Sequence, residues 1–463
     1  MKSKLQKFYE SIKGKRIALC GIGVSNTPLA LMFAQKGALV TVCDRRSKEQ
    51  LGQVAEELEA KGIALKLGEN YLKDIEADII FRTPGMQYYL PELCEYRRRG
   101  VAVTSEMEVF FELCPAKIIA VTGSNGKTTT TTIISELLLA KGERVWLGGN
   151  IGRALLPLIE EMSENDFAVV ELSSFQLISM RTSPDIAVVT NLSPNHLDMH
   201  KDMNEYIDSK KNIFLHQNAF SRTVLNLDNE ITAGFADDVR GDLFTFSRKK
   251  EPERGAFADE KGDIYFNTGK QRIFVLSSDN IKIPGNHNVE NYLAAISATW
   301  GYVGIEDIRK VAADFGGVEH RAELVRELKG VRYYNDSIAT TPSRTMQGTL
   351  SLYEDKIILI AGGYDKKIPF DSFGNALAQK VKLLILMGVT ADKIEQSVKS
   401  AADYTLGSPE IIRVNSMAEA VQAANKYAAK GDVVSLSPAC ASFDMYPNFE
   451  ARGKDFKQLV NGL

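Results

Sequence analysis

The chain lacks the features that would place it in a membrane or outside the cell. None of its apolar runs approaches the ~20 residues of a membrane-spanning helix. Its first ten residues, MKSKLQKFYE, contain no apolar stretch of the kind found in signal peptides. The five cysteines are scattered and none has C-x-x-C spacing, which argues against a disulfide framework or a zinc site. We therefore expect a cytoplasmic protein with reduced thiols.

The net charge is also small, at −3, because 59 acidic residues nearly balance 56 basic residues. Such a balance gives no support for nucleic acid or an anionic membrane as a partner. Apolar residues make up 44% and charged residues 25% of the chain, as is typical of a soluble globular protein. The 463 residues correspond to about three domains, although no Pro- or Ser-rich linker separates them.

Apolar strands alternate with helical stretches along most of the chain, which predicts parallel sheets covered by helices. We expect three α/β units, with boundaries at 1–108, 109–317 and 318–463. In the first unit the spacing predicts one helix over 49–61, and in the third it predicts strands at 331–334, 356–360, 383–387 and 433–436. The stretch 242–276 alternates and is rich in Gly, Asp and Asn, so we predict antiparallel hairpins there.

The most informative segment is 117–132, KIIAVTGSNGKTTTTT. An apolar run stops at Gly123-Ser124-Asn125-Gly126-Lys127-Thr128-Thr129 and apolar residues then recur at helical spacing, which predicts a strand, a phosphate loop and a helix. Lys127 could reach the outer phosphates, and the hydroxyl of Thr128 or Thr129 could hold Mg²⁺. The loop is a shortened variant, because Val121 occupies the first glycine position of the usual motif. The alternative is an ordinary Gly-rich turn.

A second glycine-containing loop follows the first predicted strand of the chain. Gly21 and Gly23 lie in this loop, and Asp44-Arg45-Arg46 ends the next strand. The arrangement resembles a dinucleotide fingerprint, but Asn26 replaces the third glycine. We therefore favour a nucleotide or phosphate ligand other than NAD, with a purely structural turn as the alternative. The two arginines could pair with phosphate or stack on a base, or they could be solvated surface charges.

Polar residues also follow the predicted strands of the second unit. Glu171 ends an apolar strand and could hold Mg²⁺, or it could belong to a capped helix start. His196 and His200 have the i, i+4 spacing of zinc ligands. Because no Glu or Cys pattern accompanies them, we favour His196 as a ligand on the magnesium side. Lys210 lies on the following helix, where sequence alone predicts only a solvated charge.

Two further groups of polar residues could contact a nucleotide or a second ligand. Asn288 and Asn291 lie three apart on one helix and could bind an adenine edge or ribose, or cap the helix. Polar loops leave three strands of the third unit, at 334–341, 361–367 and 435–442. Open parallel sheets bind ligands beyond the carboxyl ends of their strands, so we expect a second ligand there. In this unit Arg321 and Asp336 are plausible ATP contacts, while Lys366 and Ser442 suit a carboxylate.

Taken together, these motifs resemble the Mur ligases, which are ATP-dependent amide-forming enzymes of bacterial cell-wall synthesis. The motifs are G-S-N-G-K-T-T (123–129), G-G-N-I-G (148–152), E-L-S-S-F-Q (171–176), N-x-x-x-N-H-x-D (191–198), H-N-x-x-N (287–291), H-R (320–321), N-D-S-x-A-T (335–340) and S-P-A-C-A-S-F-D-x-Y-x-N-F-E-x-R-G (437–453). Two stretches, 172–176 and 437–453, look specifically like the members that add D-glutamate. The resemblance covers the whole chain.

The resemblance implies a fold and an activity. The fold is an α/β architecture of three domains: an N-terminal Rossmann-like parallel sheet, a central P-loop domain with an antiparallel hairpin sheet, and a C-terminal Rossmann-like domain. The activity is ligation of D-glutamate to UDP-N-acetylmuramoyl-L-alanine, with ATP, two Mg²⁺ ions and a carbamylated Lys210. We expect a monomer that has neither nucleic acid nor a membrane as a partner. An NAD-dependent oxidoreductase, a nucleotide-binding regulator without turnover and a Mur ligase for another amino acid are the alternatives.

The resemblance also assigns roles to single residues. ATP would be bound by Gly123, Ser124, Asn125, Gly126, Lys127, Thr128, Thr129, Asn288, Asn291, Arg321 and Asp336. The UDP-sugar would be bound by Ser25, Asp44, Arg45, Arg46, Gly85 and Asn150, and D-glutamate by Thr340, Lys366, Ser442 and Phe449. The catalytic residues would be Lys127, Glu171, His196 and Lys210, and the metal ligands Thr128, Thr129, Glu171, His196 and carbamylated Lys210. Ile338 stands where relatives often have a lysine, which leaves the charge contact to Lys366 or Lys367.

Overall fold

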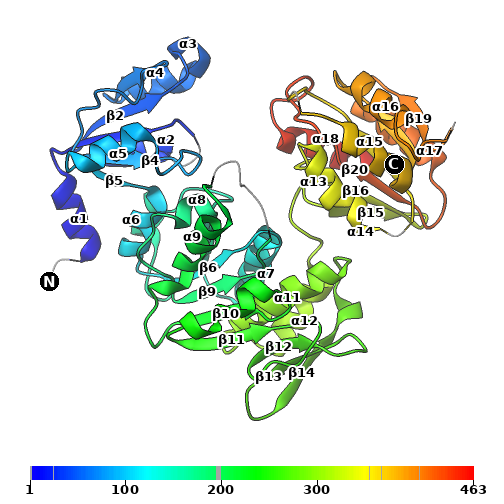
Figure 1. Ribbon diagram of the computed structural model, residues 1–463, viewed down its shortest axis with the longest axis horizontal. Helices are drawn as coiled ribbons and strands as arrows, with labels where there is room; N and C mark the ends of the chain where they lie inside the picture. Colours follow the sequence, from blue (N-terminus) through cyan, green and yellow to red (C-terminus); the bar gives the residue numbers. More distant parts are fainter. Residues whose placement is uncertain (1–2, 24–25, 194–199, 354, 367, 406) are drawn as a thin grey trace. The chain divides into compact units, whose positions relative to one another are not determined.

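A computed structural model describes residues 3–23, 26–193, 200–353, 355–366, 368–405 and 407–463. Ser25 and His196, for which the sequence predicts roles, therefore lie outside the described residues. The chain divides into two compact units, residues 1–281 with 286–313, and residues 282–285 with 314–463 (Figure 1). No helix in the described ranges is both long and apolar enough to cross a membrane.

The first unit begins with a parallel sheet of five strands in the order β3-β2-β1-β4-β5. Its strands are β1 (Arg16–Cys20), β2 (Leu39–Asp44), β3 (Ala64–Leu67), β4 (Ile79–Arg82) and β5 (Ala102–Thr104). Its helices are α1 (Lys4–Ile12), α2 (Asn26–Gln35), α3 (Lys48–Leu51), α4 (Gln53–Ala60), α5 (Pro91–Arg98) and α6 (Glu106–Leu113). The strand order reverses between β1 and β4, which is the point where such sheets bind ligands. The single helix predicted over 49–61 is wrong, because Gly52 adopts φ +54° and separates α3 from α4.

A second, six-stranded parallel sheet follows in the same unit, in the order β11-β10-β9-β6-β8-β7. Its strands are β6 (Lys117–Thr122), β7 (Val145–Gly149), β8 (Phe167–Glu171), β9 (Ile186–Val189), β10 (Arg222–Asn226) and β11 (Asp242–Phe246). Its helices are α7 (Lys127–Lys141), α8 (Ser174–Leu177), α9 (Met203–Leu215), α10 (Glu230–Ala233), α11 (Asn286–Thr299) and α12 (Ile305–Asp314). All residues of β8 and β9 are buried, as expected for strands covered on both faces.

An antiparallel sheet is present in this unit, but it is shorter than predicted. It consists of β12 (Gly255–Ala258), β13 (Asp263–Asn267) and β14 (Arg272–Ser277). The first part of the predicted hairpin region instead forms β11, which pairs in parallel with β10. The alternating sequence of β11, DLFTF, is compatible with a parallel or an antiparallel sheet. The pattern therefore could not identify its pairing partner.

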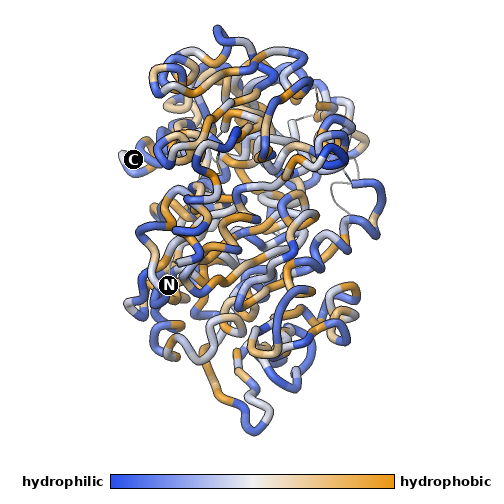
Figure 2. The backbone as a smooth tube through the Cα atoms, turned by 90° about the vertical axis from the view of Figure 1, so that its left-hand side faces the viewer, coloured by the Kyte–Doolittle hydropathy of each residue, from blue (hydrophilic) through white to orange (hydrophobic). Residues whose placement is uncertain are grey.

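The two parallel sheets of the first unit share one hydrophobic core. Leu19 and Phe81 from the first sheet belong to the same buried cluster as Ala120 and Val170 from the second. Phe110 of α6 belongs to this cluster as well. The boundary expected at residue 108 therefore falls inside a helix that packs into a shared core. Apolar and hydrophilic stretches alternate along the backbone (Figure 2), and the buried residues are largely apolar.

The second unit is built on a six-stranded sheet in the order β15-β16-β20-β17-β18-β19, in which only β15 is antiparallel to its neighbour. The strands are β15 (Glu323–Leu328), β16 (Val331–Asn335), β17 (Ile357–Ala361), β18 (Val381–Leu386), β19 (Glu410–Arg413) and β20 (Val433–Leu436). The helices are α13 (Pro342–Gln347), α14 (Thr349–Leu352), α15 (Asp371–Lys380), α16 (Ala391–Lys399), α17 (Met417–Tyr427) and α18 (Phe449–Asn461). Separate apolar cores cover its two faces, with Leu359 in one and Ile358 in the other.

The four strands predicted in this unit correspond to β16, β17, β18 and β20. The sequence did not reveal β15 and β19, because they are partly exposed edge strands without a continuous apolar run. The α/β fold with parallel sheets, a central antiparallel sheet and a mixed C-terminal sheet is confirmed.

Candidate active site

The loop between β6 and α7 has a backbone that only glycine can form at two positions. Gly123 has φ +151°, and a Cβ atom there would lie 1.9 Å from Thr190 Oγ1. Gly126 has φ +78°, and a Cβ atom there would lie 2.3 Å from Asn291 Oδ1. The Lys127 ammonium at the start of α7 donates hydrogen bonds to the carbonyls of Gly123 (2.9 Å) and Ser124 (3.2 Å). The loop, the helix N-terminus and this ammonium together form a site suited to phosphate.

A buried carboxylate lies at the end of the neighbouring strand. β8 pairs with β6, so that Glu171 stands beside Val121, the second residue before the loop. The Asn150 amide donates a 2.7 Å hydrogen bond to Glu171 Oε1. The other oxygen, Oε2, is buried and has no hydrogen-bond donor within the described part of the chain. An acceptor left in this state suits a cation, because burying a charged oxygen without a partner is costly.

Lys210 is buried, contrary to the solvated position that its sequence context predicts. Its side chain on α9 is 2% exposed, and its ammonium donates to Thr122 Oγ1 (3.1 Å) and to the Gly123 carbonyl (3.0 Å). Burial and the nearby charge of Lys127 lower the pKa of Lys210 well below its ordinary value, and Glu171 opposes this shift. The lysine therefore tends toward an uncharged amine beneath the phosphate loop.

Helix α11 brings Asn288 and Asn291 to the same loop. Asn291 Oδ1 accepts a 3.1 Å hydrogen bond from Thr130 Oγ1, and its amide nitrogen donates to Asn288 Oδ1 at 3.1 Å. Asn291 also lies against Gly126. Asn291 is therefore beside the phosphate loop, and Asn288 is hydrogen-bonded to Asn291.

His200, whose spacing from His196 is that of zinc ligands but for which zinc was not favoured, has other partners. Its Nε2 lies 2.8 Å from Ser174 Oγ and its Nδ1 lies 3.3 Å from Glu205 Oε2. The ring stacks on Phe175, with centroids 5.2 Å apart. Among the described residues, which do not include His196, no group of three or more His, Cys, Asp and Glu side chains is suited to a metal.

The polar residues of the first sheet surround the carboxyl ends of β1 and β2. Asp44 accepts hydrogen bonds from the Ile22 N–H (2.6 Å) and from Arg46 Nε (3.0 Å). Burial opposes ionisation of Asp44, but the hydrogen bonds from Arg46 and Ile22 prevail and lower its pKa. Arg45 and Gly85 are exposed, and the space above the Gly85 Cα is open to at least 4 Å. These residues can meet a ligand at the point where the strand order reverses.

The second unit holds Arg321 and Asp336 close to each other. Asp336 is buried and accepts hydrogen bonds from Thr349 Oγ1 (2.7 Å), Ser437 Oγ (2.8 Å) and the Ala322 N–H (3.2 Å). Burial raises the pKa of Asp336, although these hydrogen bonds and the charge of Arg321 oppose the shift. Asp336 thus fixes the backbone next to Arg321.

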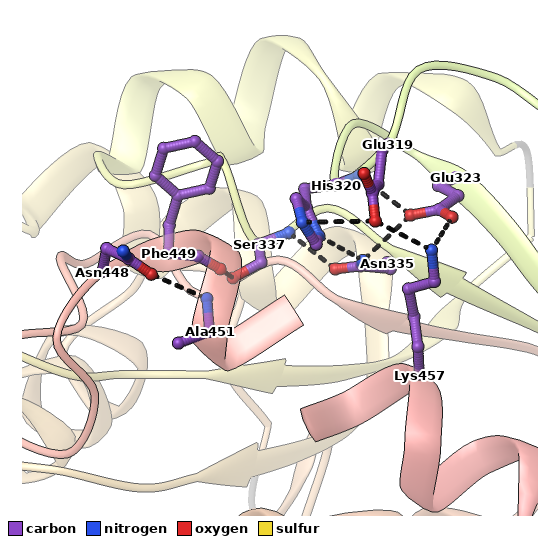
Figure 3. Close-up of polar contacts among 9 residues, drawn as sticks. All are labelled: Glu319, His320, Glu323, Asn335, Ser337, Asn448, Phe449, Ala451 and Lys457. Carbon is purple, nitrogen blue, oxygen red and sulfur yellow. Dashed lines mark hydrogen bonds and ion pairs between the residues drawn. The ribbon is translucent and has the colours of Figure 1, made fainter. Parts of the chain in front are cut away.

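The four residues predicted to bind D-glutamate lie in two areas of the second unit. The Lys366 ammonium donates a 3.2 Å hydrogen bond to Thr340 Oγ1, and burial and the charge of Arg344 lower its pKa. Phe449 begins α18, where its carbonyl accepts a hydrogen bond from Ser337 Oγ (2.8 Å) and its ring meets His320 edge-on (Figure 3). Ser442 is buried in the loop after β20.

Arg452 of α18 joins Ser337, which contacts Phe449, to the loop after β20 that holds Ser442, and sequence reasoning gave it no role. Its guanidinium donates to the carbonyls of Ser337 (2.9 Å), Cys440 (3.1 Å) and Ala441 (3.1 Å). The sequence did contain a signal, because Arg452 shares one helical face with the buried Phe456 and Val460 at i+4 and i+8. A charged residue in the apolar phase of a helix indicates a buried hydrogen-bonding role.

The first unit also contains a cavity of about 480 Å³ that was not predicted. It lies between the segment after β4 and the segments around α8 and the start of α9. It is lined by Met86, Gln87, Tyr88, Tyr89, Phe175, Ile178, His200, Lys201 and Glu205. The predicted site residues thus form separate groups: the phosphate-loop and nucleotide-sugar groups in the first unit, and the Arg321, Asp336 and D-glutamate groups in the second.

Comparisons with known proteins agree with this geometry. The family model "Mur ligase middle domain" matches residues 121–299, and the model "Mur ligase, glutamate ligase domain" matches residues 320–440. The UDP-N-acetylmuramoylalanine--D-glutamate ligase of Acetivibrio thermocellus is 51% identical over 466 residues, and that of Clostridium botulinum (strain Hall) is 49% identical over 465 residues. Each alignment covers 100% of both chains.

Solved structures support the same architecture. The UDP-N-acetylmuramate-alanine ligase of Thermotoga maritima superimposes with a TM-score of 0.58 at 20% identity, covering 97% of this chain and 99% of that chain. At this identity the likeness concerns the fold alone. The full-length relatives at about half identity carry the assignment further. The chain belongs to the Mur ligase family.

Proposed function

We propose that this protein is an ATP-dependent ligase that joins D-glutamate to UDP-N-acetylmuramoyl-L-alanine in cytoplasmic peptidoglycan precursor synthesis. The observation that carries the proposal is the grouping of Lys127, Glu171 and Lys210 around one phosphate loop. Full-length relatives named for this activity support the choice of substrates. Both substrates are small molecules, and we propose that the protein acts as a monomer.

The reaction follows from the weakness of a carboxylate as an electrophile. ATP would transfer its γ-phosphoryl group to the alanine carboxylate, giving an acyl phosphate and ADP. The amine of D-glutamate would attack the acyl carbon, and the tetrahedral intermediate would expel phosphate as the amide forms and the nitrogen loses a proton. Lys127 would stabilise the charge that develops on the transferred phosphoryl group. Phosphate release that requires both substrates tests this account against a nucleotide-binding regulator without turnover.

The residues around Glu171 fit a divalent cation. The buried Glu171 Oε2 lacks a donor among described residues, and hard oxygen ligands suit Mg²⁺. Thr128 or Thr129, Glu171 and a carbamate on Lys210 would hold two Mg²⁺ ions, together with His196. When bound, Mg²⁺ would neutralise phosphate charge.

The surroundings of Lys210 fit carbamylation. An uncharged amine can add to CO₂ to form a carbamate and release one proton, whereas an ammonium cannot. Burial favours the uncharged form of Lys210. The carbamate formed on it would be a negatively charged group near Glu171. The carbamate would therefore turn a buried base into a metal ligand.

The remaining residues would hold the other two substrates. Ser25, Asp44, Arg45, Arg46, Gly85 and Asn150 would bind the UDP-sugar, since those described lie at or near strand ends in the first unit. Thr340, Lys366, Ser442 and Phe449 would bind D-glutamate. ATP would contact the phosphate loop, Asn288 and Asn291 in the first unit. In the second unit it would contact Arg321 and Asp336.

Replacing Lys366 with alanine should raise the KM for D-glutamate at least about tenfold, which corresponds to ~1.5–3 kcal/mol for a charged hydrogen bond. Lys366 offers a point charge next to Thr340, and no lysine stands at position 338 to share this role. The KM for ATP should move much less. Steady-state kinetics with each substrate varied in turn provides the measurement.

Lys393→Ala is the matched control, because Lys393 is a neighbouring exposed lysine that pairs with Asp365. It should leave both KM values near those of the wild type. If Lys366→Ala affected ATP and D-glutamate equally, Lys366 would be a nucleotide or closure residue and the D-glutamate pocket would be misplaced.

A further inference from the structure

Arg82, at the end of β4, is one of the most deeply buried large side chains in the protein. It is 1% exposed, although arginine is seldom fully buried. Its guanidinium donates to the carbonyl of Phe175 and to Ser179 Oγ, both at 2.8 Å, and more weakly to the Met86 carbonyl at 3.4 Å. Nothing in the sequence around Arg82 indicated this role, because its partners lie 93 and 97 residues away.

The charge of Arg82 forms no close ion pair within the described ranges. No carboxylate lies within 4 Å of its guanidinium in the described ranges, and its Nε is buried without an acceptor there. Burial lowers the pKa of Arg82, and the charge of the more distant Glu108 only opposes this shift. A buried charge satisfied only by neutral oxygens is unfavourable compared with an apolar side chain of the same size. Stability alone therefore does not account for an arginine at this position.

The acceptors of Arg82 belong to two segments with different tasks. Met86 follows Gly85, in the segment that leaves β4 at the strand-order reversal of the first sheet. Phe175 and Ser179 lie in the segment that leaves β8 just after Glu171. Arg82 thus joins the segment that contains Gly85, which is predicted to bind the nucleotide-sugar, to the segment that follows Glu171 beside the phosphate loop.

The segment after β8 is fixed at its other end to the last residues of β6, directly before the phosphate loop. The Leu172 N–H donates to the Val121 carbonyl (2.9 Å), and Thr122 Oγ1 donates to the Leu172 carbonyl (2.8 Å). A displacement at Phe175 would therefore act on residues adjoining Glu171. Arg82 also contacts the cavity wall, because Met86, Tyr88 and Phe175 line the cavity and Tyr88 lies with its ring centroid 5.5 Å from the guanidinium.

We propose that Arg82 is a positioning residue that holds the segment after β4 against the segment after β8. This contact would place the bound nucleotide-sugar correctly relative to the phosphate-loop residues Lys127, Glu171 and Lys210. The inference rests on the proposed function. Arg82 touches neither ATP nor the reacting atoms in this account. Its loss impairs use of the nucleotide-sugar far more than use of ATP.

The test compares Arg82→Met with Arg222→Met. Arg222 is partly buried and also donates to backbone carbonyls, those of Ala298 and Trp300, but it joins β10 to the end of α11. Both variants remove a guanidinium that binds backbone carbonyls and should lower the thermal midpoint. Only Arg82→Met should raise the Kd and KM for UDP-N-acetylmuramoyl-L-alanine, by at least about tenfold, with the KM for ATP changed less than about threefold.

Two further variants keep the test decisive if Arg82→Met fails to fold. Ser179→Ala removes one acceptor and should shift the same Kd in the same direction by a smaller factor, while Arg82→Lys should restore part of the affinity. Equal effects on both substrates, or the same Kd change in Arg222→Met, would overturn the inference. A wild-type protein that binds the nucleotide-sugar but forms no product would instead contradict the proposed function.

Discussion

Replacing Lys127 with alanine should reduce turnover by on the order of 10³-fold or more, because its ammonium supplies charge stabilisation in phosphoryl transfer. Lys127 begins α7, and the carbonyls of Gly123 and Ser124 hold its Nζ at the loop. No other residue type at this position places a cation there with the same reach. Steady-state phosphate release with all three substrates measures the loss, and circular dichroism checks that the fold is retained.

Lys141→Ala provides the control for this experiment, since Lys141 is an exposed lysine at the other end of the same helix. Its turnover should match that of the wild type. Near-normal phosphate release from a folded Lys127→Ala protein would show that the loop is an ordinary turn between a strand and a helix.

Replacing Lys210 with alanine should also be severe, with a loss on the order of 10²-fold or more, as expected when a group that supports a metal or a charged site is removed. The loss should be partly reversed by short carboxylic acids such as formate or acetate. A small carboxylate could enter the space that the buried side chain vacates and replace the negative charge of the carbamate. Activity measured over a range of acetate concentrations provides the readout.

The neighbouring lysine supplies the control for this prediction. Lys211 is paired with Asp238 and lies outside the loop contacts that Lys210 makes. Lys211→Ala should keep near wild-type activity, and acetate should not restore activity to Lys127→Ala. A Lys210→Ala protein as active as the wild type would reduce Lys210 to a structural residue.

Local motifs allowed the phosphate loop to be predicted from sequence. The glycines, lysine and threonine of the loop lie within the six consecutive residues from Gly123 to Thr128, so they can be recognised together in the sequence. Lys210 is the opposite case. Its burial beneath Thr122 and Gly123 depends on how α9 packs, and no pattern of neighbouring residues encodes that contact.

Contacts between distant segments account for most of what the sequence did not reveal. The Asn150 hydrogen bond to Glu171 arises from the pairing of β7 with β8. Arg82 and Arg452 bind carbonyl oxygens, which every residue possesses and which therefore leave no trace in the sequence of the partner. The edge strands β15 and β19 lack the apolar run by which central strands are recognised.

The activity is defined by which amino acid the protein joins to which acid. The direct measurement is to incubate the protein with ATP, Mg²⁺, UDP-N-acetylmuramoyl-L-alanine and a panel of amino acids, and to identify the products by mass spectrometry. We expect one amide product, formed with D-glutamate, together with one ADP and one phosphate for each bond. A product formed preferentially with another amino acid, or ATP hydrolysis with no amide formed, would contradict it.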